Sequence, residues 1–197
     1  MVKPVRRIVT GHDSEGRSVF LEDGLAPHPF SPSHSPNVGF TNLWLLDAIP
    51  ASNAVGEGDP TAGPFKLEPP AGGNVVRIVE FPPDRERNYG NQADVFRQYG
   101  AAQAHDTGAR HPGFHKTHSV DYAVVIEGEI WALMDVGETL MKAGDVLIHA
   151  ARTTPGPTGA TTSRACSSSS TQPRPSDQAA ALRPRGGDFC RVSRAAV

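Results

Sequence analysis

The sequence predicts an all-β fold built from short antiparallel strands, for two reasons. Runs rich in strand-forming residues lie at 74–81 and between 120 and 148, and in the first run Val76, Ile78 and Glu80 alternate with Val75, Arg77 and Val79. Gly128, Gly137 and Gly144 interrupt the second region at intervals of about eight residues, as turns between short strands do. A chain of 197 residues, 38% of them hydrophobic, suits one domain of this kind.

The first 39 residues are expected to form an N-terminal arm that carries short strands. The runs VRRIV at 5–9 and SVFL at 18–21 flank a turn-rich segment, which indicates a hairpin. Four prolines follow within residues 26–37. Because proline has no backbone N–H to donate, that segment is predicted to be a loop.

The main β-domain is predicted at residues 40–149. Its expected strands lie at 38–49, 74–81, 120–126, 129–135, 139–141 and 146–148. The polar segment 84–110 is expected to hold a short helix at 94–99, and a mobile flap is the alternative interpretation of the same residues.

The segment that leads into the strand at 120–126 carries polar side chains at every second position. These residues are His115, Thr117, Ser119 and Asp121. In a regular strand they would share one face, whereas His118 would point to the other face unless a β-bulge shifted the register. An imidazole and a carboxylate suit Fe(II), Mn(II), Ni(II) or Zn(II), but two ligands bind weakly, so the site needs a third.

This segment resembles the first motif of the cupin superfamily, which runs Gly, a short gap, His-x-His, three or four residues, Glu, six residues and Gly. His115 matches the first histidine, Asp121 stands at the position of the glutamate, and Gly128 follows after the expected gap. Thr117 stands where the second histidine would be. The resemblance, which extends to small single-domain cupins, covers residues 40–149 and implies a cupin-type jelly-roll barrel, or double-stranded β-helix.

The resemblance also implies a role in small-molecule metabolism. His115 and Asp121 would hold a divalent metal ion, Fe, Mn, Ni or Zn, together with a histidine from the second cupin motif. The candidate residues of the substrate pocket are Thr117, Tyr122 and Trp131. The implied chemistry is that of a metal-dependent oxidoreductase, decarboxylase or isomerase acting on a small organic metabolite.

Residues 150–197 have a different composition and are predicted to form a low-complexity, disordered tail. The segment is rich in Ser, Thr, Pro, Ala and Arg and contains neither lysine nor glutamate. No histidine follows His149, so the histidine of the second cupin motif is missing. The barrel is therefore predicted to be incomplete at its C-terminal end.

A shifted reading frame explains this change of composition. If the first two bases of each observed codon were the last two of the intended one, residues 151–159 are compatible with Gly-Thr-Asn-His-Ala-Trp-x-Asn-Arg, which fits the second cupin motif. The serine run at 167–170 then becomes hydrophobic, as a closing strand requires. Sequencing the coding DNA around codon 149 tests this hypothesis, and a frame that encodes no closing β-strand would contradict it.

Structural roles compete with the functional ones. His115 could be a barrel-lining residue held by hydrogen bonds, and Asp121 could cap a turn or pair with an arginine. Tyr122 and Trp131 suit core positions as well as pocket walls. For the whole chain, the alternatives are a non-catalytic barrel that binds a small ligand or forms a homodimer, and an inactive truncated product with unpaired sheet edges.

Charge and hydropathy limit the partners. The formal net charge is -2, so no overall electrostatic attraction to nucleic acid or to an anionic membrane is expected, and a small molecule is the expected ligand. The N-terminal segment lacks the apolar run of a secretory signal, and no stretch is long enough to span a bilayer. A cytoplasmic location is expected.

Overall fold

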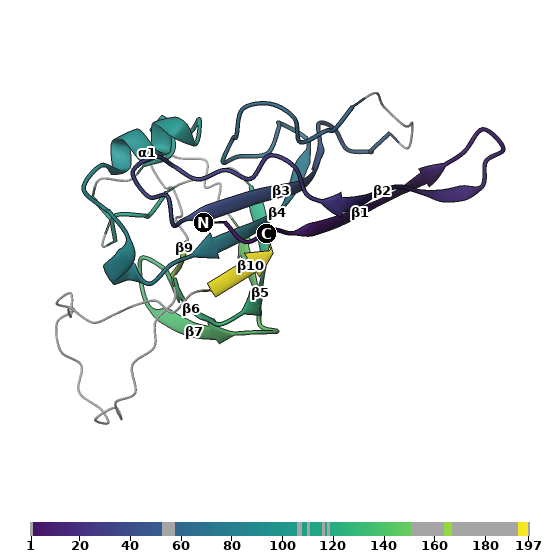
Figure 1. The fold of residues 1–197 in the computed structure, drawn as a ribbon. Coiled ribbons are helices and arrows are strands. Elements are labelled where there is room, and N and C mark those ends of the chain that lie inside the picture. Colours follow the sequence, from purple (N-terminus) through teal and green to yellow (C-terminus); the bar gives the residue numbers. More distant parts are fainter. Residues whose placement is uncertain are drawn as a thin grey trace.

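A computed structural model describes residues 2–52, 58–105, 108–109, 111–115, 117, 119–150, 164–166 and 193–196. These residues form a five-stranded sheet, a three-stranded sheet and a separate hairpin, and one α-helix lies among them (Figure 1). All of the strand pairs are antiparallel. The predicted all-β fold class is confirmed, and the arrangement is consistent with a cupin-type barrel.

The N-terminal arm is a β-hairpin of β1 (Arg6–His12) and β2 (Ser18–Leu25), as the sequence predicts. At its turn the Asp13 carboxylate accepts hydrogen bonds of 2.9 Å from the backbone N–H groups of Glu15 and Arg17. Within the described part of the chain, β1 and β2 pair only with each other. Figure 1 shows the hairpin extending away from the two sheets.

The two sheets supply the body of the domain. The five-stranded sheet runs in the order β3 (Gly39–Leu46), β4 (Asn74–Phe81), β10 (Ser193–Ala196), β5 (Val120–Glu127) and β8 (Val146–Ala150). The three-stranded sheet runs in the order β7 (Glu138–Lys142), β6 (Glu129–Leu133) and β9 (Arg164–Cys166). The strands predicted at 74–81 and between 120 and 148 are confirmed. Alternation and glycine turns depend on the local sequence alone, so they predict strands without knowledge of the tertiary structure.

Strands β9 and β10 come from the region predicted to be a disordered tail. β9 pairs with the edge of β6, and β10 inserts between β4 and β5. Open sheet edges offer backbone hydrogen bonds to any extended segment, whatever its side chains, which is why composition alone did not predict these strands. Residues 151–163, 167–192 and 197 lie outside the described residues, and both the shifted reading frame and the boundary at residue 149 stay predictions.

β10 is short and pairs with only part of each neighbouring strand. Its last pairs join Ala196 to Ile78 of β4 and to Val124 of β5. Residues 74–77 of β4 pair with β3, and residues 120–123 of β5 pair with β8; among the described strands these segments have no partner on their other side.

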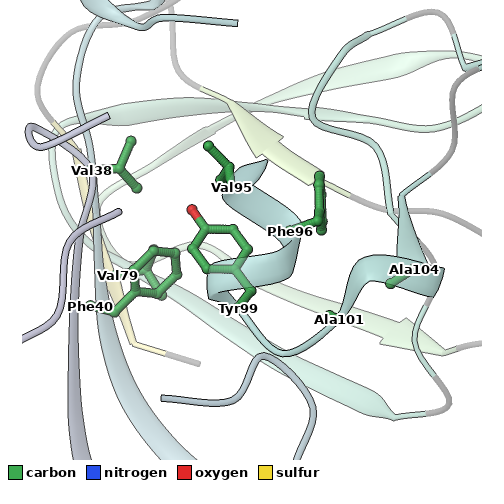
Figure 2. Packing of buried hydrophobic residues seen from close by; sticks show 8 residues of the cluster. All are labelled: Val38, Phe40, Val79, Val95, Phe96, Tyr99, Ala101 and Ala104. Carbon is green, nitrogen blue, oxygen red and sulfur yellow. The ribbon is translucent and has the colours of Figure 1, made fainter. Parts of the chain in front are cut away.

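The largest hydrophobic core joins this sheet to the helix α1 (Gln92–Gln98). This core contains Val95 and Phe96 of the helix, Tyr99 at its end and the sheet residues Phe40 and Val79, and Figure 2 shows the Tyr99 ring lying toward Phe40 and Val79. A helix of seven residues is unstable in isolation, so burial of this face stabilises it. The helix predicted at 94–99 is confirmed, with a start two residues earlier.

Two smaller cores lie against the three-stranded sheet. The first consists of Val125, Ile130, Ala132 and Met141. The second consists of Phe114 and Leu133, with Trp131 packed against them. Ile130 and Phe114 are completely buried, so this sheet is held to the rest of the domain by close packing as well as by hydrogen bonds.

Gly73, in the turn that enters β4, is expected to tolerate no side chain. A Cβ atom there would lie 2.0 Å from the backbone oxygen of Leu46, so the ends of β3 and β4 would have to separate. We expect Gly73→Ala to lower the free energy of unfolding by about 1–3 kcal/mol. The control is Gly24→Ala, where a Cβ meets nothing within 4 Å. Equal urea midpoints for the two variants would contradict the expectation.

Candidate functional site

The polar row predicted from the sequence lies along one side of the segment that leads into β5. The Ser119 hydroxyl lies 2.7 Å from Asp121 Oδ1, to which it donates, and 3.1 Å from Thr117 Oγ1. His115 Nδ1 lies 3.2 Å from the carbonyl oxygen of Gly113. A carbonyl can only accept, so this contact places the proton of a neutral His115 on Nδ1 and makes Nε2 the acceptor.

These side chains line a cavity of about 920 Å³, at the upper end of the range for small-molecule sites. Its walls come from β4, β5 and β8, from the loop at 67–73, and from the end of α1. Phe40, Phe96 and Tyr99 supply aromatic surface, which Figure 2 shows in the core next to the helix. The His115 ring lies 5.7 Å from the Phe96 ring, measured between centroids, so the polar row adjoins the aromatic wall.

Arg77 of β4 places a buried positive charge in the wall of the cavity. Its side chain is only 4% exposed, and its two terminal nitrogens donate to the carbonyl oxygens of Leu67 (3.0 Å) and Lys66 (2.9 Å). The guanidinium carbon lies 5.0 Å from the centre of the Phe65 ring. Burial lowers the pKa of Arg77 to about 10, and the negative charge of Asp121 opposes this shift. The guanidinium therefore stays charged at neutral pH.

His149 of β8 is the second buried polar group in the cavity wall. It is the cross-strand partner of Asp121, and cross-strand partners place their side chains on the same face of a sheet. Its side chain is 7% exposed, and neither ring nitrogen has a hydrogen-bond partner among the described residues. Burial lowers the pKa of His149, with the negative charge of Asp121 acting in the opposite direction. The ring is therefore neutral at pH 7.

The structure brings most of the predicted site residues together. His115, Thr117, Asp121 and Tyr122 all line the cavity. Trp131 does not; it is half-buried on β6 and packs beside Phe114 and Leu133. The residue set aside by strand parity, His118, lies outside the described residues. Two further histidines lie near aromatic rings: His105 stacks on Phe96, and His111 meets Tyr89 edge-on.

Sequence reasoning missed Arg77 and His149 as site residues. Arg77 shares the parity of Val75 and Val79, which could have placed it on the inner face of β4. His149 follows the last predicted strand, and only its pairing with Asp121 reveals its place. Both residues come from strands whose neighbours are distant in sequence.

The predicted metal centre needs three protein ligands that lie close together. Among the described residues, no group of three His, Cys, Asp or Glu side chains is placed so that it could hold a metal ion. His115 and Asp121 thus share a cavity without a third described ligand beside them. The divalent metal stays a prediction. In the same part of the chain, no helix is long and apolar enough to cross a membrane.

Known proteins show distant similarity to this chain. No family model matches it. Two proteins of Diaporthe leptostromiformis, phomopsin biosynthesis cluster proteins C' and D, are each 28% identical to it over 152 residues, covering 73% of this chain and 65% of the relative. A cupin-domain-containing oxidoreductase, fogC, of Aspergillus ruber is 26% identical over 151 residues, covering 75% of this chain and 61% of the relative. The match therefore spans less than two thirds of each relative's length.

Proposed function

We propose that this chain is a cupin-type barrel of oxidoreductase function that binds and converts a small organic metabolite in the cavity between β4, β5 and β8. The observation that carries the proposal is the row of His115, Thr117 and Asp121 on one side of an apolar cavity. The similarity to a cupin-domain-containing oxidoreductase supports both the barrel type and the class of reaction.

Each residue of the row has a role that follows from its chemistry. The Ser119 hydroxyl donates to Asp121 and holds that carboxylate in position, while the other carboxylate oxygen remains an acceptor for a ligand hydroxyl. Thr117 supplies a hydroxyl that can donate or accept, and His115 supplies an acceptor nitrogen next to the Phe96 ring. If a divalent metal binds, His115 and Asp121 are its proposed ligands, and it would supply Lewis acidity or oxygen activation.

A second candidate function is ligand binding without chemistry. It is favoured by the lack of a group of three metal-binding side chains among the residues that the structure describes. In this case the same cavity would hold a metabolite through hydrogen bonds and apolar contact alone.

Metal analysis of the purified chain distinguishes the two functions. A metal-dependent oxidoreductase is expected to carry close to one divalent metal ion per chain, which His115→Ala should remove. The matched control is His12→Ala, because His12 is exposed on the hairpin and distant from the cavity walls. A metal content that is negligible, or the same in all three proteins, would contradict metal-dependent function and leave the binding role.

A further inference from the structure

We propose that Arg77, His149 and Asp121 form a recognition subsite for an uncharged aromatic ligand that carries both a hydroxyl and a carbonyl group. The inference deepens the proposed function, since it rests on the ligand entering the same cavity, but it needs no metal ion. The three residues come from three strands, and all of them line the cavity.

The first argument is the state of the buried nitrogens. Arg77 uses its terminal nitrogens on backbone carbonyls, whereas its Nε has no partner among the described residues. Both ring nitrogens of His149 also lack a hydrogen-bond partner among the described residues. Buried polar groups are nearly always hydrogen-bonded in native proteins, and both residues line the cavity, so these unpaired nitrogens indicate that a polar ligand binds beside them.

The second argument is the direction of each hydrogen bond. The Arg77 Nε–H can only donate, so the ligand must offer it an acceptor such as a carbonyl oxygen. The Asp121 carboxylate can only accept, so the ligand must offer it a donor such as a hydroxyl. Neutral His149, one donor and one acceptor, can serve either group. A ligand with a hydroxyl and a carbonyl therefore matches all three side chains.

The third argument is the balance of charge. Arg77 contributes one positive charge and Asp121 one negative charge, so the two charges balance each other. Asp121 interacts electrostatically with both of the other side chains. An anionic ligand would place a second negative charge beside Asp121 in a wall that water reaches poorly, whereas an uncharged ligand leaves the balance unchanged.

The fourth argument is the shape of the site. Arg77 lies on β4 next to Ile78, and Asp121 lies on β5 three residues before Val124; Ile78 and Val124 are the residues that pair with Ala196 of β10. Both Arg77 and Asp121 line the same cavity. Phe40, Phe96 and Tyr99 line the same cavity and offer aromatic surface for the body of the ligand.

Three fragment probes test the inference on the full chain after treatment with EDTA. They are 3-hydroxyacetophenone, which has both groups; acetophenone, which lacks the hydroxyl; and 3-hydroxybenzoate, which is anionic. Dissociation constants from titration calorimetry or ligand-observed NMR are expected to be lowest for 3-hydroxyacetophenone, with each of the others weaker by about fivefold or more.

Variants separate the subsite from the cavity as a whole. His149→Leu should weaken 3-hydroxyacetophenone about fivefold or more, while His12→Leu should leave it unchanged. Asp121→Asn removes the negative charge, so it should move the preference of the site toward 3-hydroxybenzoate. Arg77→Lys keeps the charge but loses the Nε donor. Cooperative thermal unfolding of this variant is the check that it folds.

The outcomes distinguish this inference from the proposed function. Equal affinities for the three probes, no saturable binding of any probe, or full affinity in folded His149→Leu protein would overturn the subsite and leave the metal result untouched. If the purified chain, before EDTA treatment, carries no metal and the probes still show the expected preference, metal-dependent function would be contradicted and the subsite retained.

Discussion

Phe96→Ala is expected to lower the free energy of unfolding by about 3–5 kcal/mol, the usual cost of removing a buried phenylalanine ring. The Phe96 side chain is 1% exposed and packs in the core between α1 and the five-stranded sheet. Its ring also contacts Tyr99, His105 and His115, so the cavity wall is expected to lose its shape together with the core.

Equilibrium urea unfolding followed by circular dichroism measures this effect. The matched control is Phe20→Ala on the hairpin, because the Phe20 ring is 77% exposed and its loss should change stability by no more than about 0.5 kcal/mol. If the two variants unfolded at the same urea concentration, α1 would not be packed on the sheet in the way described.

The strands with both ends marked by local signals were predictable from the sequence. β4 occupies 74–81 as expected, since its residues alternate and Pro82 ends it. β5 to β8 follow the glycine turns, and Gly128, Gly137 and Gly144 adopt the positive φ angles that such turns require. The shared face of Thr117, Ser119 and Asp121 also followed from alternation alone.

Pairing between distant strands was not predictable. The position of β8 beside β5, which sets His149 opposite Asp121, depends on a register that no local pattern encodes. The insertion of β10 next to Arg77 depends on open backbone edges and not on side-chain propensity. For the same reason Trp131 could not be assigned: an aromatic residue on a strand suits a core or a pocket wall, and the tertiary packing places it beside Phe114.

The second large effect is expected at the junction between the hairpin and the body of the domain. The Arg7 guanidinium is 6% exposed and binds Glu22 on β2 and Asp59 in the loop at 58–62. It also donates to the carbonyl oxygen of Leu43 on β3, at 3.3 Å. Arg7 therefore joins β1 to three other parts of the chain with charge-assisted hydrogen bonds.

Arg7→Leu is expected to lower the free energy of unfolding by about 3 kcal/mol, the low end of the range for breaking a buried ion pair, because both carboxylates keep some contact with water. The neighbouring Arg6→Leu is the matched control. Arg6 pairs with Asp23 on the surface, where both side chains are about half exposed or more, so its loss should change stability little. If the two variants lost the same free energy of unfolding, Arg7 would contribute no more to stability than its exposed neighbour Arg6.

The cost of losing Arg7 should also depend on pH. The hydrogen bond from Arg7 holds the pKa of Asp59 well below its usual range, against the opposing effect of burial. A carboxyl whose folded pKa is depressed stabilises the fold above its unfolded pKa of about 3.9, and this stabilisation is lost as the pH falls through the folded pKa.

In Arg7→Leu the two carboxylates face each other without the cation, and protonation relieves their repulsion. The difference in stability between wild type and Arg7→Leu should thus be complete near pH 7 and shrink below about pH 4. Urea unfolding of both proteins near neutral pH and near pH 3 measures it; a difference that stayed constant with pH would show that packing of the Arg7 side chain, and not its charge, joins the hairpin to the domain.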